Sequence, residues 1–403
     1  MLEDSSAQRA LDALDAFAIE LPSWGFADTG TRFGKFHQSA AASTIAEKLH
    51  DAGLVHKLTG ACPTVAVHVL WDFRPEDSPQ DIAQLAADHG VRLGSINPNL
   101  FQDQHYKFGS FCSPDEQVRA AALEHTLRCI DIGQAVGSRA LSIWLADGTN
   151  YPGQDNLYRR KRSLSEGLRS VHQALAMRWP EATLLVEYKP FEPAFYHTDL
   201  ADWGMSYVMC RSAGPRAKVL VDTGHHLPGA NVEHIVAFLL DEDMLGGFHF
   251  NDRKYADDDL TLGSIDPYAV FRIFDQVAQF EFDTGRRAEI EYMVDQSHNL
   301  KPKLEAMVQT VCEAQRQFVR AQLVDRPALA AAQRRCDIVA AETILRRAFE
   351  TDPSPLLSTW RTARGLPADP LAALRESGVI ERLGQERSAA RALRGDTVTS
   401  SYA

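Results

Sequence analysis

Short apolar segments alternate with longer amphipathic segments along the first three quarters of the chain. Runs such as TVAVHVLW, TLLVEY and KVLVD are rich in aliphatic and β-branched residues, which is typical of buried strands. Eight strands are predicted in this way, at 18–22, 64–71, 91–97, 140–146, 183–188, 218–222, 247–251 and 288–295. The segments around and between them repeat apolar residues at helical spacing, and helices are predicted at 3–18, 43–58, 79–89, 115–136, 157–178, 200–213, 231–243 and 266–280.

This alternation of strands and helices predicts a parallel sheet, because parallel strands need a crossover helix between them. Eight such units over 1–300 predict a (β/α)8 TIM barrel. The remainder, 301–403, has helical periodicity and no strand pattern, so we expect an all-helical extension that packs on a neighbouring subunit. The Gly- and Thr-rich segment 28–43 is predicted to be a loop.

Composition excludes several classes of protein. The chain has 403 residues and a formal net charge of -12, which argues against nucleic acid or an anionic membrane surface as partner. No apolar run is long enough to span a bilayer, and the acidic, amphipathic first residues do not resemble a signal peptide. The six cysteines include no CxxC pair, which favours reduced thiols in a cytoplasmic protein. Motifs for nucleotide binding, serine hydrolysis and HExxH zinc sites are absent.

Polar residues follow the seventh predicted strand in the stretch GGFHFNDRKYADDD, residues 246–259. His249 faces the polar side of the strand, and Asp257 and Asp259 project to one side if the backbone there is extended. Imidazole and carboxylate ligands suit Mn²⁺, Mg²⁺, Co²⁺ or Zn²⁺. On this stretch alone, a charged surface loop beside a core histidine is an equally good interpretation.

The ends of neighbouring strands change that balance. Glu187, Asp222 and Asp295 end the apolar runs of strands five, six and eight, and His249 lies in strand seven. In a barrel these four side chains meet at one rim, where TIM-barrel chemistry takes place. Burying three carboxylates together costs several kcal/mol each unless a cation neutralises them. We therefore predict a metal site, with separate ion pairs in the barrel as the alternative for any single residue.

Further candidates lie around the same rim. A second cation is predicted on His225, Asp257 and Asp259, with Asp222 bridging the two sites. Two cations a few Å apart can clamp adjacent oxygens and activate a bound water. Lys189 is interpreted as an ion-pair partner or a donor to a substrate oxygen. The other predicted pocket residues are His68, placed in mid-strand, Trp71 and Trp144 at strand ends, and Phe33 in a polar loop.

Four motifs occur in the order VEYKPFEPAFY, LVDTGHH, GGFHFNDRKYADDD and MVDQSHN. Together with LPSWG, GTRFGKF, HVLWD and IWLADGTNYPGQ, they resemble the bacterial L-rhamnose isomerases that also act on D-allose and other aldoses. The resemblance covers nearly the whole chain. More distantly, the pattern resembles the xylose isomerases, which share the barrel and a two-metal arrangement.

The resemblance implies two divalent cations per subunit, usually Mn²⁺, in a homotetramer. It implies that the first, structural cation is held by Glu187, Asp222, His249 and Asp295, and the second, catalytic cation by His225, Asp257 and Asp259. It also implies that His68, Trp144 and Lys189 line the substrate pocket and that Phe33 enters a neighbouring subunit's pocket. Pro190 and a shorter N-terminus depart from the family, and both leave substrate preference and subunit packing open.

The expected reaction interconverts L-rhamnose and L-rhamnulose, and related pairs such as D-allose and D-psicose, by a metal-assisted 1,2-hydride shift on the open-chain sugar. The predicted catalytic residues are Glu187, Lys189 and Asp295. A competing route through an enediol would use Glu187 as base, which its role as metal ligand disfavours. The alternative function is a metal-dependent ketose 3-epimerase, which would need one metal between two carboxylate bases and would lack the His225, Asp257 and Asp259 set.

Overall fold

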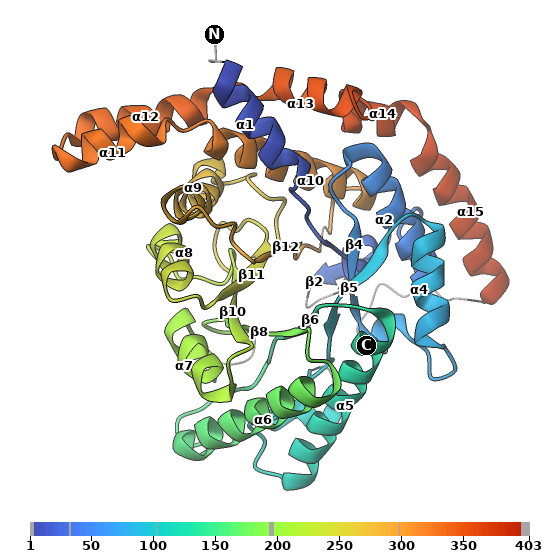
Figure 1. Cartoon of the computed structure of the whole chain (residues 1–403). Helices are drawn as coiled ribbons and strands as arrows, with labels where there is room; N and C mark the ends of the chain where they lie inside the picture. The colour runs from blue at the N-terminus through green and yellow to red at the C-terminus, as the bar shows by residue number, and fades with distance from the viewer. Residues whose placement is uncertain (1–3, 32–33, 102, 193–196, 298, 396–403) are drawn as a thin grey trace.

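The computed structural model describes residues 4–31, 34–101, 103–192, 197–297 and 299–395. Its central sheet contains all eight predicted strands in parallel, in the order β1-β4-β5-β6-β8-β10-β11-β12 (Figure 1). The bounds are β1 (Leu21–Pro22), β4 (Thr64–His68), β5 (Arg92–Asn97), β6 (Ala140–Ile143), β8 (Thr183–Glu187), β10 (Ala217–Asp222), β11 (Leu245–Phe250) and β12 (Glu291–Val294).

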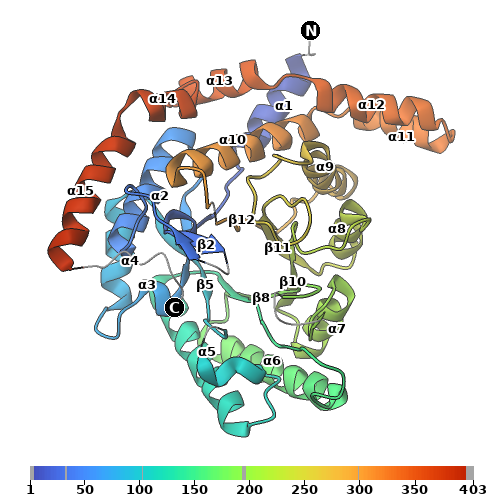
Figure 2. The same cartoon turned by 180° about the vertical axis from the view of Figure 1, so that it is seen from behind.

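The sheet closes on itself beside β1. Glu20 forms a parallel bridge with Met293, its amide nitrogen donates to the carbonyl of Tyr292 at 2.8 Å, and its carbonyl accepts from Val294 at 2.9 Å. The first and last strands are therefore neighbours. The architecture is the predicted (β/α)8 TIM barrel, with its strands at the centre of Figures 1 and 2.

A ring of eight helices surrounds the strands. They are α2 (Ile45–Thr59), α4 (Pro79–Asp88), α5 (Glu116–Val136), α6 (Leu157–Arg178), α7 (Trp203–Ala213), α8 (Val232–Asp241), α9 (Pro267–Thr284) and α10 (Lys303–Gln322). Many begin at a side chain that accepts from the first turn, which satisfies amide groups left unpaired at a helix start: Thr44, Asp115, Asn156, Asp202, Asn231 and Asp266. No helix in the described part of the chain is long and apolar enough to cross a membrane.

Side chains inside the barrel lie in layers. Ala140, Leu185, Leu220 and Met293 form a separate buried apolar cluster. Two residues further along β8 and β10 the inward positions are Glu187 and Asp222, because strand side chains alternate between faces. The barrel thus has an apolar floor, and a polar layer lies directly above it at the carboxyl ends of the strands.

The last five helices form an arch along the outside of the ring, visible in both views: α11 (Arg326–Arg334), α12 (Ile338–Glu350), α13 (Ser354–Thr362), α14 (Pro370–Glu376) and α15 (Val379–Arg394). Buried Arg387 on α15 pairs with Asp51 on α2 at 2.6 Å, and Trp360 on α13 donates to Asp15 on α1 (Asp4–Asp15) at 2.6 Å. The extension therefore packs on its own barrel. Its boundary at 300 and its packing on a neighbouring subunit stay predictions.

Two local predictions were wrong. Strand 64–71 ends early, at His68, and Val69–Asp72 forms the one-turn helix α3, because the Asp72 carboxylate accepts from the amide of His68 at 2.9 Å and turns the chain. His68 therefore ends its strand rather than lying in its middle. Segment 28–43 is not all loop, since β2 (Thr29–Thr31) pairs antiparallel with β3 (Gly34–Phe36).

Candidate active site

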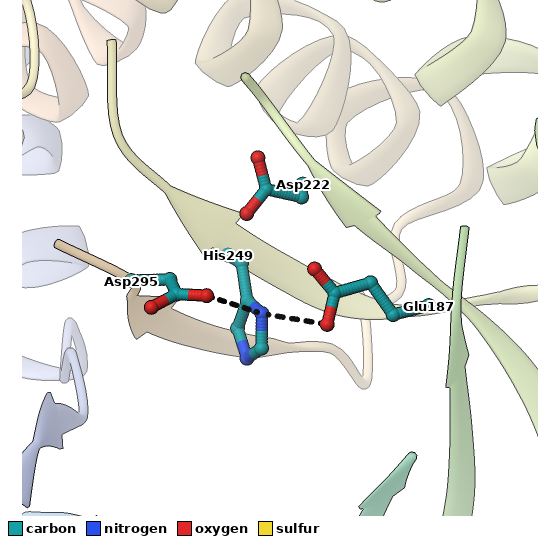
Figure 3. Close-up of side chains that lie close together, drawn as sticks. All are labelled: Glu187, Asp222, His249 and Asp295. Atoms are coloured by element: carbon teal, nitrogen blue, oxygen red, sulfur yellow. Dashed lines mark ion pairs between the residues drawn. The ribbon is translucent and has the colours of Figure 1, made fainter. Parts of the chain in front are cut away.

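Four predicted side chains meet at the rim above the apolar floor (Figure 3). Suitable ligand atoms of Glu187, Asp222, His249 and Asp295 all lie within 4.8 Å of one another. His249 stands between two carboxylates, with Nδ1 3.2 Å from Glu187 Oε2 and 3.5 Å from Asp295 Oδ2. Because adjacent parallel strands end at the same level, four residues far apart in the sequence share one small volume.

Several atoms of this group lack partners. His249 Nδ1 and Glu187 Oε1 are buried and make no hydrogen bond within the described part of the chain, although each has an oppositely charged neighbour close by. Nor does any Lys or Arg there form an ion pair with Glu187, Asp222 or Asp295. Buried polar atoms are normally satisfied, and buried charges are normally paired. A divalent cation between these ligands would bind the unpaired atoms and neutralise the carboxylate charges, so the donor set fits a divalent cation.

A second group of potential ligands provides a contrast. Cys112, Asp147 and Asp199 also approach one another closely. Here, however, Arg160 binds Asp199 with two nitrogens, and Asp147 accepts from the amides of Ser110 and Cys112 at 2.7 and 2.8 Å. Its charges are neutralised by protein groups, so this group is a structural clamp between loops and α6. The absence of such a counter-charge distinguishes the rim site.

The electrostatics of the rim group indicate excess negative charge. Burial opposes ionisation of Glu187, yet His249 and His225 lower its pKa to about 2. Burial, together with Glu187 and Asp295, raises the pKa of Asp222 to about 7. Burial acts against the His249 cation, but Glu187 raises the pKa of His249 to about 9. The cluster retains protons that carboxylates and histidines normally lose, and a cation would replace them.

Neighbouring groups orient the carboxylates. Asn251 donates through its amide to both oxygens of Asp222 at 3.0 Å, and the amide nitrogen of Gly224 donates to Asp222 Oδ1 at 2.6 Å. A Cβ at Gly224 would lie 2.4 Å from Asn251 Oδ1, so only glycine permits this approach. On the other side of the cluster, Trp24 Nε1 donates to Asp295 Oδ1 at 2.8 Å. Such partners fix the ligand orientation before any cation binds.

The second predicted set lies next to the first but is less tightly gathered. His225 Nδ1 is 3.0 Å from the carbonyl of Tyr188, and its Nε2 is 3.2 Å from Asp257 Oδ1. Lys189 donates to Asp257 Oδ2 at 2.6 Å and also pairs with Glu192. Asp259 accepts from Ser297 at 2.9 Å, and burial and the charge of Asp257 raise its pKa well above the usual value.

All members of the two sets except Asp222 line a cavity of about 520 Å³. One wall is aromatic: the ring centres of His68 and Trp71 are 4.2 Å apart, those of Trp24 and His68 4.9 Å, and those of Phe101 and Trp144 5.0 Å. Aromatic faces opposite charged groups suit a small molecule that has both C–H and hydroxyl surfaces. The volume is in the range of small-molecule sites.

The predicted pocket residues His68, Trp71, Trp144 and Lys189 all line this cavity, whereas Phe33 lies outside the described residues. Sequence reasoning missed several other lining residues, among them three from outside the barrel strands: Trp24, Lys48 and Phe101. Only Trp24 had a detectable signal, because it directly follows the first strand and its short LPSWG motif is unusual.

The fold and the rim site define the class of protein. Residues 61–295 match the family model described as xylose isomerase-like TIM barrel, and the chain belongs to this family. It is 39% identical to a probable sugar isomerase of Mesorhizobium japonicum over 94% of this chain and 89% of that one. A probable sugar isomerase of Rhizobium meliloti is also 39% identical, over 96% of this chain and 92% of that one. Xylose isomerase of Thermus thermophilus is 24% identical over 59% and 60%.

Solved structures agree with the fold. D-allulose 3-epimerase from Methylomonas sp. superposes with a TM-score of 0.54, at 13% identity, over 74% of this chain and 95% of that one. L-ribulose 3-epimerase superposes with a TM-score of 0.51, at 16% identity, over 80% and 98%. At these identities the likeness concerns the barrel alone.

Proposed function

We propose that this protein is a metal-dependent sugar isomerase that interconverts an aldose and its ketose. L-rhamnose and L-rhamnulose are the first candidate pair, and D-allose and D-psicose the second. The observation that carries the proposal is the rim group, which has no Lys or Arg counter-charge among the described residues and lies beside a sugar-sized cavity. Glu187, Asp222 and His249 of this group are buried, and Asp295 is partly buried. The similarity to probable sugar isomerases over more than nine tenths of the chain supports it.

In this proposal, Glu187, Asp222, His249 and Asp295 hold one divalent cation, and His225, Asp257 and Asp259 hold another. Mn²⁺ is the expected metal, with Co²⁺, Mg²⁺ and Zn²⁺ as alternatives. The cations supply positive charge where an alkoxide develops during aldose–ketose interconversion. Buried His225 Nδ1 faces the carbonyl of Tyr188, and donation there would leave Nε2 free as a ligand atom.

The protein's own groups would orient the sugar and exclude water. The wall of Trp24, His68, Trp71, Phe101 and Trp144 would cover the C–H face of the open-chain sugar. Lys189, which now donates to Asp257, would donate to a sugar oxygen on the same side. The pKa of Glu187 is lowered to about 2, which makes it a weak base, and its oxygens lie against two histidines, so it is poorly suited to take a proton from C2. Direct transfer of hydrogen from C2 to C1 as hydride is therefore the favoured route.

One observation favours a second candidate, a ketose 3-epimerase. At the rim, the residues that lie closest together form a single group of potential ligands, while Lys189 donates a hydrogen bond to Asp257 of the second set. An epimerase of this barrel type would need one cation and two carboxylate bases. The same experiment separates the two functions, because an epimerase converts ketose to ketose and leaves the aldose unchanged.

The test uses protein stripped with EDTA and then loaded with Mn²⁺. L-rhamnose and D-allose are each supplied as substrate, D-psicose is supplied as ketose, and products are separated by chromatography. Formation of ketose from either aldose, only with metal, supports the isomerase. Conversion of D-psicose to another ketose, with both aldoses untouched, would instead support the epimerase. Loss of C2 deuterium to solvent from labelled aldose would contradict the hydride route.

A matched pair of variants ties activity to the site. His249→Gln should abolish Mn²⁺ binding at the rim and lower kcat/KM by at least about 100-fold, because it removes a direct ligand. His172→Gln changes an equally buried histidine on α6, whose Nε2 accepts from the amide of Arg216, and should leave kcat/KM unchanged. Equal activity of the two variants would refute the assigned site. The homotetramer stays part of the proposal, and light scattering of the intact protein tests it.

A further inference from the structure

Three hydrogen bonds converge on the buried carboxylate of Asp72, at the end of α3. Lys48 Nζ on α2 donates to Oδ1 at 2.6 Å, Ser23 Oγ donates to Oδ2 at 2.6 Å, and the amide of His68 donates to Oδ2 at 2.9 Å. The Asp72 side chain is 0% exposed and that of Lys48 is 7% exposed. One carboxylate thus joins an outer helix to two segments at the rim.

Both of these segments carry parts of the candidate active site. Ser23 begins η1 (Ser23–Phe26), whose next residue, Trp24, donates to Asp295 Oδ1 at 2.8 Å. The other oxygen of Asp295 lies 3.5 Å from His249 Nδ1. Two short hydrogen bonds, joined through the backbone of Ser23 and Trp24, therefore connect Asp72 with a carboxylate of the rim group.

We propose that Asp72, with Lys48 as its counter-charge, is a positioning residue that acts through Ser23 and Trp24 to hold Asp295 in its cation-facing orientation. The positive charge of Lys48 offsets the free-energy cost of burying the Asp72 carboxylate, and the ionised carboxylate can accept three hydrogen bonds at once. This inference rests on the proposed function, because it concerns how the same site binds its cation.

A purely structural role is the competing explanation. Asp275 on α9 and Arg326 on α11 form an equally short buried pair, 2.6 Å apart, and neither residue lines the cavity. Buried ion pairs therefore occur in this protein without a role at the site. The Asp72 pair differs because its carboxylate also binds Ser23, whose neighbour Trp24 contacts the rim group. The test must therefore interrupt this connection and leave the ion pair intact.

Ser23→Ala removes this link and leaves the pair of Asp72 with Lys48 in place. Ser138→Ala is the matched control: Ser138 is also buried and donates to the carbonyl of Gly94 at 2.6 Å, at the opposite end of the barrel. Trp24→Phe and the double variant Ser23→Ala/Trp24→Phe complete a double-mutant cycle. The readouts are Mn²⁺ affinity by calorimetry, kcat and KM with L-rhamnose, and the unfolding midpoint.

Ser23→Ala and Trp24→Phe should each raise the Mn²⁺ dissociation constant about 10-fold, the usual effect of losing a group that orients a ligand. The double variant should bind no more weakly than Trp24→Phe alone, because both changes interrupt one path. Ser138→Ala should lower the unfolding midpoint to a similar extent but keep Mn²⁺ affinity within about twofold of wild type.

The inference is overturned if Ser23→Ala binds Mn²⁺ as tightly as Ser138→Ala does, or if the effects of the two single changes multiply in the double variant. Failure of the proposed function looks different. In that case wild-type protein isomerises no sugar, while the Mn²⁺ affinities still follow the expected pattern.

Discussion

Binding of Mn²⁺ to the rim group should release protons, because several of its ligands hold protons that the cation would displace. At pH 7, His249 has a pKa of about 9, so it is protonated and must lose about one proton to present Nδ1 as a ligand. Asp222, with a pKa of about 7, is half protonated and contributes about half a proton. Glu187, with a pKa of about 2, contributes none. Burial also raises the pKa of the fourth ligand, Asp295, so about 1.5 protons per cation is the smallest release that we expect at this site.

The direction of the pH dependence follows from the same groups. Because free protein binds more protons than loaded protein, Mn²⁺ affinity rises with pH, by at least about 30-fold from pH 6.5 to 7.5, and levels off above the pKa of His249. Calorimetry in buffers of different ionisation enthalpy measures the released protons directly. His172→Gln should release the same number as wild type. Release near zero, or an affinity that falls as pH rises, would refute the charge balance described for this cluster.

Three further changes probe other features. Gly224→Ala should weaken Mn²⁺ binding about 10- to 100-fold, because its Cβ would displace the Asn251 amide that orients Asp222; unchanged calorimetric affinity would contradict this. Arg160→Met should destabilise the fold by about 3–5 kcal/mol in urea unfolding, because it strands the buried charge of Asp199, and an unchanged midpoint would argue against the clamp. Gly94→Ala should cost about 1–3 kcal/mol, because its Cβ would lie 1.6 Å from Glu20 Oε2; adding Glu20→Ala should recover part of that loss, and no recovery would exclude this clash as the cause.

The periodic parts of the barrel could be predicted because their geometry repeats. Each strand alternates between faces and ends at a common level, so apolar runs that end in Glu187, Asp222 and Asp295 were sufficient to place these side chains together. The eight strands and the helices between them follow from the same periodicity. The prediction for 64–71 was wrong because a side-chain contact ends the strand, and that for 28–43 was wrong because two short strands pair there through their backbones.

The aperiodic parts of the site could not be predicted. Trp24, Lys48 and Phe101 reach the cavity from a 3₁₀ turn, an outer helix and a loop, and no repeat relates their positions to the strand ends. An ion pair was one of two interpretations of Lys189, but its partner, Asp257, depends on how the loop after β11 folds back, which spacing does not encode. Side-chain reach and loop geometry decide such contacts, and both depend on the finished fold.

The apolar floor formed by Ala140, Leu185, Leu220 and Met293 closes the barrel interior, so that its cavity opens at one end only. In the proposed sugar isomerase, substrate and product would therefore enter and leave at the same end of the barrel. Product would then have to leave before the next substrate molecule could bind, and slow product release would delay the next turnover. When much of the substrate has been converted, the rate of product release would therefore limit the rate of turnover.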